Sequence, residues 1–454
     1  MLSSISVIGL GKLGAPMAAC FAARGFTVHA VDLNPRKVDA INRGVPPVHE
    51  PGLAELLAEC RERISATKDI EAAVLASDAT FVVVATPSEQ DGGFSLRYAI
   101  PTCESIGRAL RTKSKYHVVV ITSTVMPGAV GGPIKSALER ASGKRCGVDF
   151  GLCYNPEFIA LGTVIRDFYH PDFLLIGESD ARAGDVLCEI YKRTCKNSPA
   201  FARMNWINAE ITKLSVNTYI TTKISYANML ARLCEKLPEA DVNVVTDALG
   251  LDTRIGAKYL KGAVSYGGPC FPRDNRALAA LASRVGASSG LAEATDIFNR
   301  AQIKSLAEAV ESHRNESDTV GILGLTYKPD TDVVEESFGL LLAQELSSRS
   351  LPVMVYDPSG DATRALDKYK NIRVASSAQE CIAESQVVVL ATPWQEFRTL
   401  QAALWVSLGP SEPRVVIDCW RALSHLDGVE GVHYVKLGFG GGAAKPLTVS
   451  SGAD

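Results

Sequence analysis

A cysteine placed among glycines and prolines is the residue of this chain whose type and setting best suit covalent chemistry. Cys270 follows Gly267, Gly268 and Pro269, and the stretch "FPRDNRALAALASRV" after it has the pattern of a helix. Exposed N–H groups and the helix dipole favour a thiolate at a helix N-terminus. The position therefore indicates a nucleophile, or a small apolar side chain in a tight loop, which is the commoner role of a single cysteine.

Polar residues on a long helix form a second candidate group. Residues 204–237 contain no glycine or proline and predict one helix of about 30 residues, roughly 45 Å long. Glu210, Lys213 and Asn217 are spaced by three and four, so they share one face of it. The face is either a solvated stripe or, because the helix is largely apolar, a buried set in which Lys213 holds an oxyanion or acts as a base.

A glycine-rich turn at the N-terminus predicts a dinucleotide site. "GLGKLG" follows a buried strand, opens a helix, and precedes Asp32, which ends the next strand 18 residues after Gly14. Gly9 permits the turn, Gly11 lets a pyrophosphate approach, and Gly14 allows close helix packing. Asp32 favours NAD over NADP because it would repel a 2′-phosphate. We expect cofactor contacts from Gly9, Gly11, Lys12, Leu13, Gly14, Asp32, Arg36, Thr86 and Thr124.

Further polar groups follow predicted strands, where ligands bind in open α/β sheets. Ser123 and Thr124 end "VVVITST", Glu157 follows "FGLCYNPE", and Asp274 lies four residues after Cys270. A thiol, a carboxylate, a lysine, an amide and a hydroxyl beside NAD suit more than alcohol oxidation. A thiol could capture an aldehyde as a thiohemiacetal, which a second oxidation converts to a thioester that water releases as an acid.

Strands and helices alternate twice along the chain, which predicts an α/β fold with two Rossmann-like, doubly wound parallel sheets joined by the long central helix. In the C-terminal third, "ESQVVVLATPWQEF" parallels "SDATFVVVATPSEQ", whereas "GILGLTYKPD" lacks the third glycine and gains Lys328. We expect this half to hold a different phosphate-bearing ligand. The expected parts are an NAD-binding domain (1–203), a helical dimerisation domain (204–314), a Rossmann-like domain for this second ligand (315–437) and a disordered tail (438–454).

Net charge, hydropathy and cysteine spacing argue against several classes of protein. The net charge of −3 gives no electrostatic case for nucleic acid or an anionic membrane, and no apolar run is long enough to span a bilayer. The 11 cysteines include no C-x-x-C pair, which argues against a disulfide framework and a zinc site, so we expect no metal. Reduced thiols fit a cytoplasmic protein. Extra helix between two sheets predicts a homodimer or higher homo-oligomer.

Across residues 4 to 430 the chain resembles the UDP-glucose/GDP-mannose dehydrogenase family. The resemblance rests on "GLGKLG", "VATPS", "STVMPG", "NPEF", "AEITKLSVN", "YGGPCFPRD" and "YKPDTD". It implies NAD-dependent, four-electron oxidation of a nucleotide sugar at C6 to the uronate, with UDP-glucose the first choice. GDP-mannose, a UDP-N-acetylhexosamine and TDP-glucose are alternatives.

The resemblance also implies roles for single residues. Cys270 corresponds to the nucleophile, Lys213 and Asn217 to the oxyanion pair, and Asp274 to a group that handles protons with a water. Glu157 corresponds to the base for thioester hydrolysis and Thr124 to a residue that orders its water. In the family, the arginine at the position of Arg254 reaches across a dimer. The implied substrate contacts are Glu157, Phe158, Lys213, Asn217, Arg254, Tyr259, Lys261, Gly267, Lys328 and Arg421.

Some positions depart from the family pattern. Leu161 stands where a glutamate is usual, Glu335 where an arginine is typical, Pro269 where a serine is usual, and Arg273 where a lysine is usual.

The residues alone leave two other functions open. A two-electron hydroxyacid dehydrogenase would also use Lys213 and Asn217 but needs no thiol. A sensor of NAD or nucleotide sugars would have lost catalysis, and Leu161 and Glu335 are its support.

Overall fold

The structure is a computed structural model that describes residues 2–366, 369–406 and 413–441. It divides into two compact units. The first contains Met1–Val216 and Ala280–Ala287, and the second contains Asn217–Ala279 and Ser288–Asp454. Each unit is built around one sheet, and the chain passes between the units three times: within two helices, after Val216 and after Ala279, and in a loop after Ala287.

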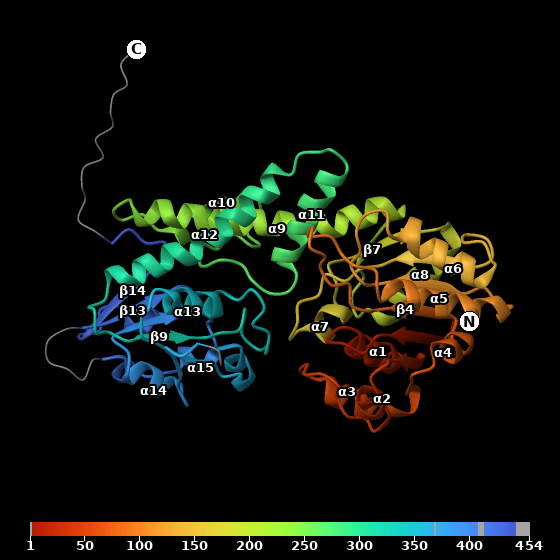
Figure 1. Cartoon of the computed structure of the whole chain (residues 1–454), viewed down its shortest axis with the longest axis horizontal. Coiled ribbons are helices and arrows are strands. Elements are labelled where there is room, and N and C mark those ends of the chain that lie inside the picture. Colours follow the sequence, from red (N-terminus) through yellow and green to blue (C-terminus); the bar gives the residue numbers. More distant parts are fainter. Residues whose placement is uncertain (1, 367–368, 407–412, 442–454) are drawn as a thin grey trace, which may run out of the picture. The chain divides into compact units, whose positions relative to one another are not determined.

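The first unit contains an eight-stranded sheet in the order β3-β2-β1-β4-β5-β6-β7-β8. Figure 1 labels two of its strands, β4 and β7. Ile5 of β1 is level with Val28 of β2 and Ala79 of β4, all in parallel pairing. The strands are β1 (Ser4–Ile8), β2 (Thr27–Val31), β3 (Ile64–Thr67), β4 (Ala79–Val82), β5 (Val118–Ile121), β6 (Gly151–Tyr154), β7 (Phe173–Glu178) and β8 (Ala200–Met204).

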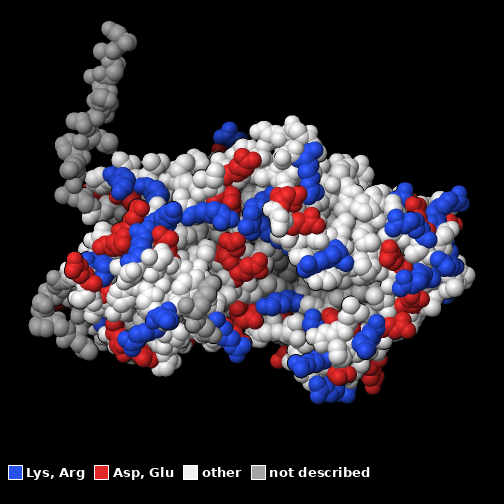
Figure 2. Space-filling view, viewed as in Figure 1, with Lys and Arg blue, Asp and Glu red and all other residues white. Residues whose placement is uncertain are grey.

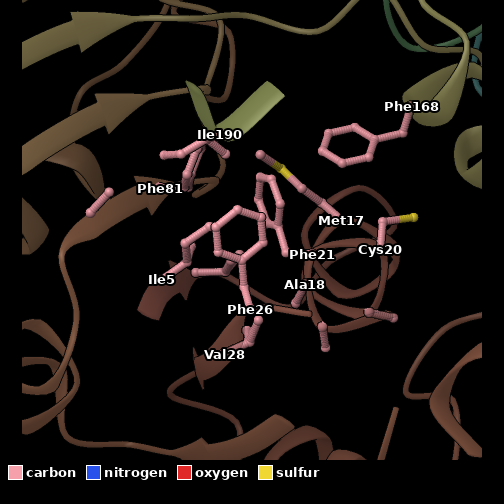
Figure 3. Close-up of a cluster of buried hydrophobic side chains, with 14 of the residues drawn as sticks. Ile5, Met17, Ala18, Cys20, Phe21, Phe26, Val28, Phe81, Phe168 and Ile190 are labelled. Atoms are coloured by element: carbon pink, nitrogen blue, oxygen red, sulfur yellow. The ribbon is translucent and has the colours of Figure 1, made fainter. Parts of the chain in front are cut away.

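Helices cover both faces of this sheet. Along β5, Val118 and Val120 join the hydrophobic cluster on one face, and Val119 and Ile121 join the cluster on the other. Figure 3 shows the first cluster, in which the ring of Phe21 packs among other apolar side chains. The helices are α1 (Gly14–Ala23), α2 (Pro35–Asn42), α3 (Leu53–Glu59), α4 (Ile70–Ala76), α5 (Ala99–Thr112), α6 (Lys135–Ser142), α7 (Val164–Tyr169) and α8 (Ala181–Thr194).

One strand pair departs from the expected parallel arrangement. β7 runs antiparallel to β6, with Tyr154 opposite Gly177, and β8 then pairs parallel to β7. Two neighbouring parallel strands need a connection that crosses back to the opposite edge of the sheet. Between β6 and β7 the chain instead makes a loop and the short helix α7, and β7 runs in the reverse direction. The loop at this reversal carries Glu157.

The second unit repeats the strand order of a dinucleotide-binding sheet. Its six parallel strands lie in the order β11-β10-β9-β12-β13-β14, which matches β3-β2-β1-β4-β5-β6 of the first unit. The strands are β9 (Val320–Leu323), β10 (Val353–Tyr356), β11 (Ile372–Val374), β12 (Val387–Leu390), β13 (Arg414–Asp418) and β14 (Val432–Lys436). Its sheet is covered by α12 (Gly290–Ser312), α13 (Phe338–Ser348), α14 (Ala378–Ala383) and α15 (Gln395–Arg398) among others. The fold class predicted from the sequence is confirmed.

The long central helix is also confirmed. α9 (Trp206–Glu235) is 30 residues long, and its residues belong to the first unit up to Val216 and to the second from Asn217. The rest of the expected helical domain consists of α10 (Val242–Leu251), α11 (Phe271–Arg284) and α12, which ends at Ser312.

The duplication extends to single hydrogen bonds. Asp32, which follows β2, accepts a hydrogen bond from the backbone N–H of Leu10 at 2.8 Å. Asp357, which follows β10, accepts one from the backbone N–H of Leu325 at 2.6 Å. In each unit a carboxylate at the end of the second strand therefore holds the start of the loop that leaves the first strand.

The stretch "GILGLTYKPD" lacks the third glycine, as the sequence analysis states, but a glycine further along the chain takes its place in the structure. A Cβ on Gly14 would lie 1.8 Å from the carbonyl oxygen of Gly9, and a Cβ on Gly339 would lie 2.0 Å from that of Gly324. Gly339 therefore has the packing role of Gly14. Gly9 and Gly14 are 5 residues apart (14 − 9), whereas Gly324 and Gly339 are 15 apart (339 − 324). The longer loop, which carries Lys328, hid the repeat.

The start of the predicted disordered tail is also corrected. The backbone N–H of Gly438 donates to the Glu235 carboxylate at 2.9 Å, and the N–H of Gly440 donates to the carbonyl oxygen of Ala240 at 2.9 Å. Residues 438–441 thus continue the fold. The remainder of the predicted tail, 442–454, lies outside the described residues.

Figure 2 shows acidic and basic side chains interspersed on the visible face of both units. Within the described part of the chain, no helix is long and apolar enough to cross a membrane.

We predict that Gly339→Ala destabilises the second unit by about 3 kcal/mol, because the added methyl group overlaps the Gly324 carbonyl. Urea unfolding followed by tryptophan fluorescence measures the change. Gly360→Ala is the matched control: a Cβ there has nothing within 4 Å, so the midpoint should stay close to that of the wild type. Equal midpoints for the two variants would contradict the assigned role of Gly339.

Candidate active site

The N-terminal glycine turn has the geometry that a dinucleotide requires. Gly9 has φ +102°, and a Cβ there would lie 2.4 Å from the carbonyl oxygen of Val83. A Cβ on Gly11, in contrast, would have nothing within 4 Å, so the backbone at this position is open to a ligand. Lys12 precedes Leu13, which is the N-cap of α1. These residues fit a pyrophosphate at the N-terminus of α1.

Asp32 is held rigidly beside this turn. One carboxylate oxygen accepts from the backbone N–H of Asn34 at 2.8 Å, and the other lies 3.3 Å from Nζ of Lys37 as well as accepting from Leu10. Each oxygen can accept more than one bond, so ribose hydroxyls could still be bound. The sequence analysis named Arg36, which is exposed; it missed Lys37, which is the residue that pairs with Asp32.

The loops after β4 and β5 are tied together. The hydroxyl of Thr86 donates to the carbonyl oxygen of Thr124 at 2.7 Å, and the hydroxyl of Ser123 donates to the carbonyl oxygen of Val84 at 2.6 Å. Thr86 and Thr124, which were predicted separately as cofactor contacts, are therefore brought together.

Glu210 anchors the same loop to the long helix. Its side chain is fully buried, and its carboxylate accepts hydrogen bonds from the backbone N–H groups of Gly128 at 2.7 Å and Val130 at 2.8 Å. Burial raises the pKa of Glu210, and these bonds oppose that rise. The sequence analysis predicted that Glu210 shares a helix face with Lys213, but it assigned no role to Glu210. The structure gives it a positioning role for the loop that follows Thr124.

Glu157 lies at the carboxyl end of β6 within a buried hydrogen-bonding group. Its Oε1 accepts from the phenol of Tyr191 at 2.9 Å, and that phenol also lies 2.5 Å from Oδ1 of Asn155. Loss of hydration raises the pKa of Glu157 to about 7, while the Tyr191 bond and the charge of Lys213 oppose the rise. Glu157 is therefore close to half-protonated at neutral pH. Tyr191 was missed by the sequence analysis because a tyrosine inside α8 has the pattern of an ordinary core residue.

Lys213 is directed at the same loop. Its Nζ donates to the backbone carbonyl oxygen of Glu157 at 2.7 Å and lies 4.5 Å from the ring centroid of Phe158. The side chain is 6% exposed. The buried alternative for this helix face is therefore the correct one at Lys213, and Glu157, Phe158 and Lys213 form one group in the first unit.

A second buried glutamate supports the loop of Glu157 from its other end. Glu50 accepts from the backbone N–H groups of Gly162 at 3.0 Å and Val164 at 2.7 Å. These bonds fix the start of α7 and the segment that contains Leu161, one of the departures from the family pattern. The sequence analysis missed Glu50 because it precedes this loop by more than 100 residues.

In the second unit, Cys270 immediately precedes α11, as predicted. The backbone N–H of Asp274 donates to the carbonyl oxygen of Cys270 at 2.8 Å, which starts the helix. All eleven cysteines lie in the described part of the chain, and Cys270 is the exposed one. A thiol at this position is accessible and faces the positive end of the helix dipole.

The glycines before Cys270 are required for packing. A Cβ on Gly267 would lie 2.3 Å from the carbonyl oxygen of Glu336. Gly268 has φ +84°, donates its N–H to the carbonyl oxygen of Glu335 at 3.0 Å, and packs against the ring of Tyr327. The cysteine loop is thus held against the long loop that distinguishes the second sheet from the first.

Asn217 and Asp274 form a buried pair beside Cys270. The amide of Asn217 donates to the Asp274 carboxylate at 2.6 Å, and Asp274 is 1% exposed. The next residue, Asn275, donates to the hydroxyls of Thr221 at 2.9 Å and Tyr266 at 3.0 Å. These bonds fix α11 on α9, so that the amide, the carboxylate and the thiol are held by two helices.

The remaining predicted substrate residues lie in the second unit and are spread over it. Arg254 is exposed and pairs with Asp252 at 2.6 Å. Arg421 is largely buried and pairs with Asp241, the N-cap of α10, at 2.6 Å, so much of its binding capacity supports the fold. The others are Tyr259 and Lys261, which are exposed, and Lys328, whose Nζ is 5.8 Å from the ring of Tyr327.

Fold and site together define an NAD-type dehydrogenase with a second, nucleotide-binding sheet. Models of three parts of one family match in order: the NAD binding domain at residues 3–195, the central domain at 207–301 and the UDP binding domain at 321–425. The chain belongs to the UDP-glucose/GDP-mannose dehydrogenase family, whose members are NAD-dependent nucleotide-sugar 6-dehydrogenases. The predicted family and the NAD cofactor are confirmed.

Individual relatives cover nearly the whole chain. UDP-glucose 6-dehydrogenase AglM of Haloferax volcanii is 35% identical over 430 residues, which is 94% of this chain and 98% of that protein. GDP-mannose 6-dehydrogenase of Pseudomonas aeruginosa is also 35% identical, over 400 residues, 85% of this chain and 90% of that protein. The solved structure of a UDP-glucose dehydrogenase from the hyperthermophilic archaeon Pyrobaculum islandicum has a TM-score of 0.86 and 32% identity, with 97% of this chain and 98% of that chain covered.

We predict that Glu210→Gln lowers the unfolding free energy by about 1–3 kcal/mol, because one of the two backbone donors would face an NH₂ group. Chemical denaturation measures the loss. Glu189→Gln, an exposed change on α8, is the control and should leave the midpoint unchanged. A wild-type midpoint for Glu210→Gln would exclude the anchoring role.

Proposed function

We propose that the protein oxidises a nucleotide sugar at C6 to the uronate in two NAD-dependent steps, with UDP-glucose as the substrate. The observation that supports this most is Cys270, an exposed thiol at the start of α11 beside the buried Asn217–Asp274 pair. An alcohol dehydrogenase that stops at the aldehyde has no use for such a thiol.

The residues divide the reaction between them. NAD, held by the glycine turn before α1 and by Asp32, would supply the hydride acceptor for both oxidations. Sγ of Cys270 adds to the C6 aldehyde to give a thiohemiacetal, whose oxidation leaves a thioester. Lys213 and Asn217, one turn apart on α9, stabilise the oxygen that carries negative charge in both tetrahedral stages. Asp274 exchanges protons with a water at the thiol side.

Glu157 is the proposed base for the last step. With a pKa of about 7 it can take a proton from water at neutral pH. The water oxygen bonds to the thioester carbon, the carbon–sulfur bond breaks, and Sγ of Cys270 leaves as a thiolate. Thr124, whose backbone is fixed by Thr86, orders this water.

UDP-glucose is favoured by the match to AglM over almost its full length and by the TM-score of 0.86 to a UDP-glucose dehydrogenase. GDP-mannose is the second candidate, because a GDP-mannose 6-dehydrogenase is as similar in identity. UDP-N-acetylhexosamines and TDP-glucose are further alternatives. The free state of all eleven cysteines supports a reducing compartment such as the cytoplasm.

We predict that the purified protein forms two NADH per sugar consumed with one member of a panel of UDP-, GDP- and TDP-sugars. Cys270→Ser should reduce acid formation by at least about 100-fold, since the covalent intermediate cannot form. Cys146→Ser, at a partly buried cysteine, is the control. One NADH per sugar would favour a two-electron dehydrogenase, and tight binding without turnover would favour a sensor.

A homodimer is part of the proposal. Tyr219, Tyr226 and Leu233 are spaced by seven on α9 and are 64%, 49% and 53% exposed, and Val244 on α10 is 68% exposed. An exposed apolar stripe on a long helix is typical of a protein interface.

We predict that Leu233→Glu shifts the molar mass measured by light scattering from dimer toward monomer, because a charge in an apolar interface loses hydration. Val148→Glu, at an exposed valine of the first unit, should leave the mass unchanged. A monomeric wild-type protein at micromolar concentration would reject the dimer.

A further inference from the structure

We propose that Tyr191 is a positioning residue for Glu157, and that its phenol directs the Glu157 carboxyl to take a proton from the water that releases the Cys270 thioester. This inference rests on the function proposed above. It assigns a role to a residue inside helix α8, whereas ligand-binding residues of a dinucleotide fold usually lie in the loops that follow the strands.

The contacts of Tyr191 leave little freedom to its hydroxyl. The side chain is fully buried, and Oη lies 2.9 Å from Oε1 of Glu157 and 2.5 Å from Oδ1 of Asn155. The amide nitrogen of Asn155 donates to the carbonyl oxygen of Leu175 at 2.9 Å. This bond fixes the orientation of the Asn155 amide, so an acceptor oxygen faces Tyr191.

The phenol has one proton and two acceptors. When Glu157 is ionised, the charged oxygen is the stronger acceptor, so Tyr191 donates to it. When Glu157 is protonated, the Tyr191 proton can turn to Asn155 while the carboxylic acid donates to Oη. The hydrogen bonds of the group therefore follow the proton on Glu157, and Glu157 keeps its place in both states.

Tyr191 remains a donor throughout this exchange. Burial and the neighbouring Glu157 raise the pKa of Tyr191 well above its usual value, so the phenol does not ionise near neutral pH. The other groups that face Glu157 are Lys213 on α9, whose Nζ binds its backbone oxygen, and Cys195 at the end of α8. Of these, Tyr191 is the one that donates to the carboxyl itself.

The step that depends on this contact is hydrolysis. Water adds to the thioester carbon and gives one proton to Glu157; the carbon–sulfur bond then breaks, and the thiolate leaves. Glu157 must be ionised before this step. The Tyr191 bond favours the ionised form, and its loss raises the pKa of Glu157. Without the phenol, a higher pH is therefore needed to ionise Glu157, and the pH dependence of hydrolysis should shift upward.

The test is Tyr191→Phe in the full-length protein. We expect the acid limb of the hydrolysis rate against pH to move upward by about one pH unit. At pH 7 hydrolysis should slow by about 5–10-fold and the Cys270 thioester should accumulate in intact-protein mass spectra. Both effects should vanish at high pH, where Glu157 is ionised in either protein. A merely structural role of Tyr191 would lower the rate at every pH.

Tyr116→Phe is the matched control, because the Tyr116 phenol lies 3.3 Å from both carboxylate oxygens of Asp180 in the same unit. Its profile should equal that of the wild type. If Tyr191→Phe does not fold, 3-fluorotyrosine at position 191 keeps the hydroxyl and, as a stronger donor, should move the limb to lower pH.

The outcomes separate the two proposals. If the wild-type protein forms two NADH through a Cys270 adduct but the variants leave the acid limb in place, the role of Tyr191 is wrong and the proposed function stands. If no nucleotide sugar is oxidised by the wild-type protein, the proposed function fails first.

Discussion

The loops at the carboxyl edges of both sheets depend on carboxylates that accept backbone N–H groups. Asp32 and Asp357 hold the loops that leave the first strand of each sheet, Glu50 holds the loop after β6, and Glu210 holds the loop after β5. Loop amides cannot pair with a neighbouring strand, and an unpaired buried amide costs free energy. A fixed carboxylate satisfies two of them at once, and it also fixes the side chains that the loop carries. The chemistry at this edge is therefore positioned by residues that need not touch a substrate.

The long helix α9 carries three of the polar side chains that hold these loops and the candidate site residues. Glu210, Lys213 and Asn217 follow one another along this helix at helical spacing. Glu210 binds the loop after Thr124, Lys213 binds the backbone of Glu157, and Asn217 binds Asp274 on α11. The same helix thus contributes side chains to both units, up to Val216 in the first and from Asn217 in the second.

Sequence reasoning succeeded where chemistry follows local pattern. The glycine turn, the acid at Asp32, the 30-residue helix and the cysteine before α11 could each be located from spacing and residue type alone. It failed where a contact joins distant parts of the chain. Glu50 and Tyr191 have no motif around them, and Gly339 was hidden by the long loop before it. The reversal of β7 was missed because an apolar run predicts a strand and does not give its direction.

Two partly or fully buried glutamates of the first unit show why one of them can handle protons. Glu210 accepts two backbone N–H bonds, which only its ionised form can fully accept in this geometry, and it is locked to its loop. Glu157, among the described residues, accepts no backbone bond at its carboxyl; its partner is the Tyr191 phenol, which can donate or accept. Lost hydration raises the pKa of Glu157 to about 7, and its two partners, the Tyr191 phenol and the charge of Lys213, only partly oppose that rise. A carboxyl whose hydrogen bonds can adapt to its proton is suited to act as a base, and one held by amides is suited to act as an anchor.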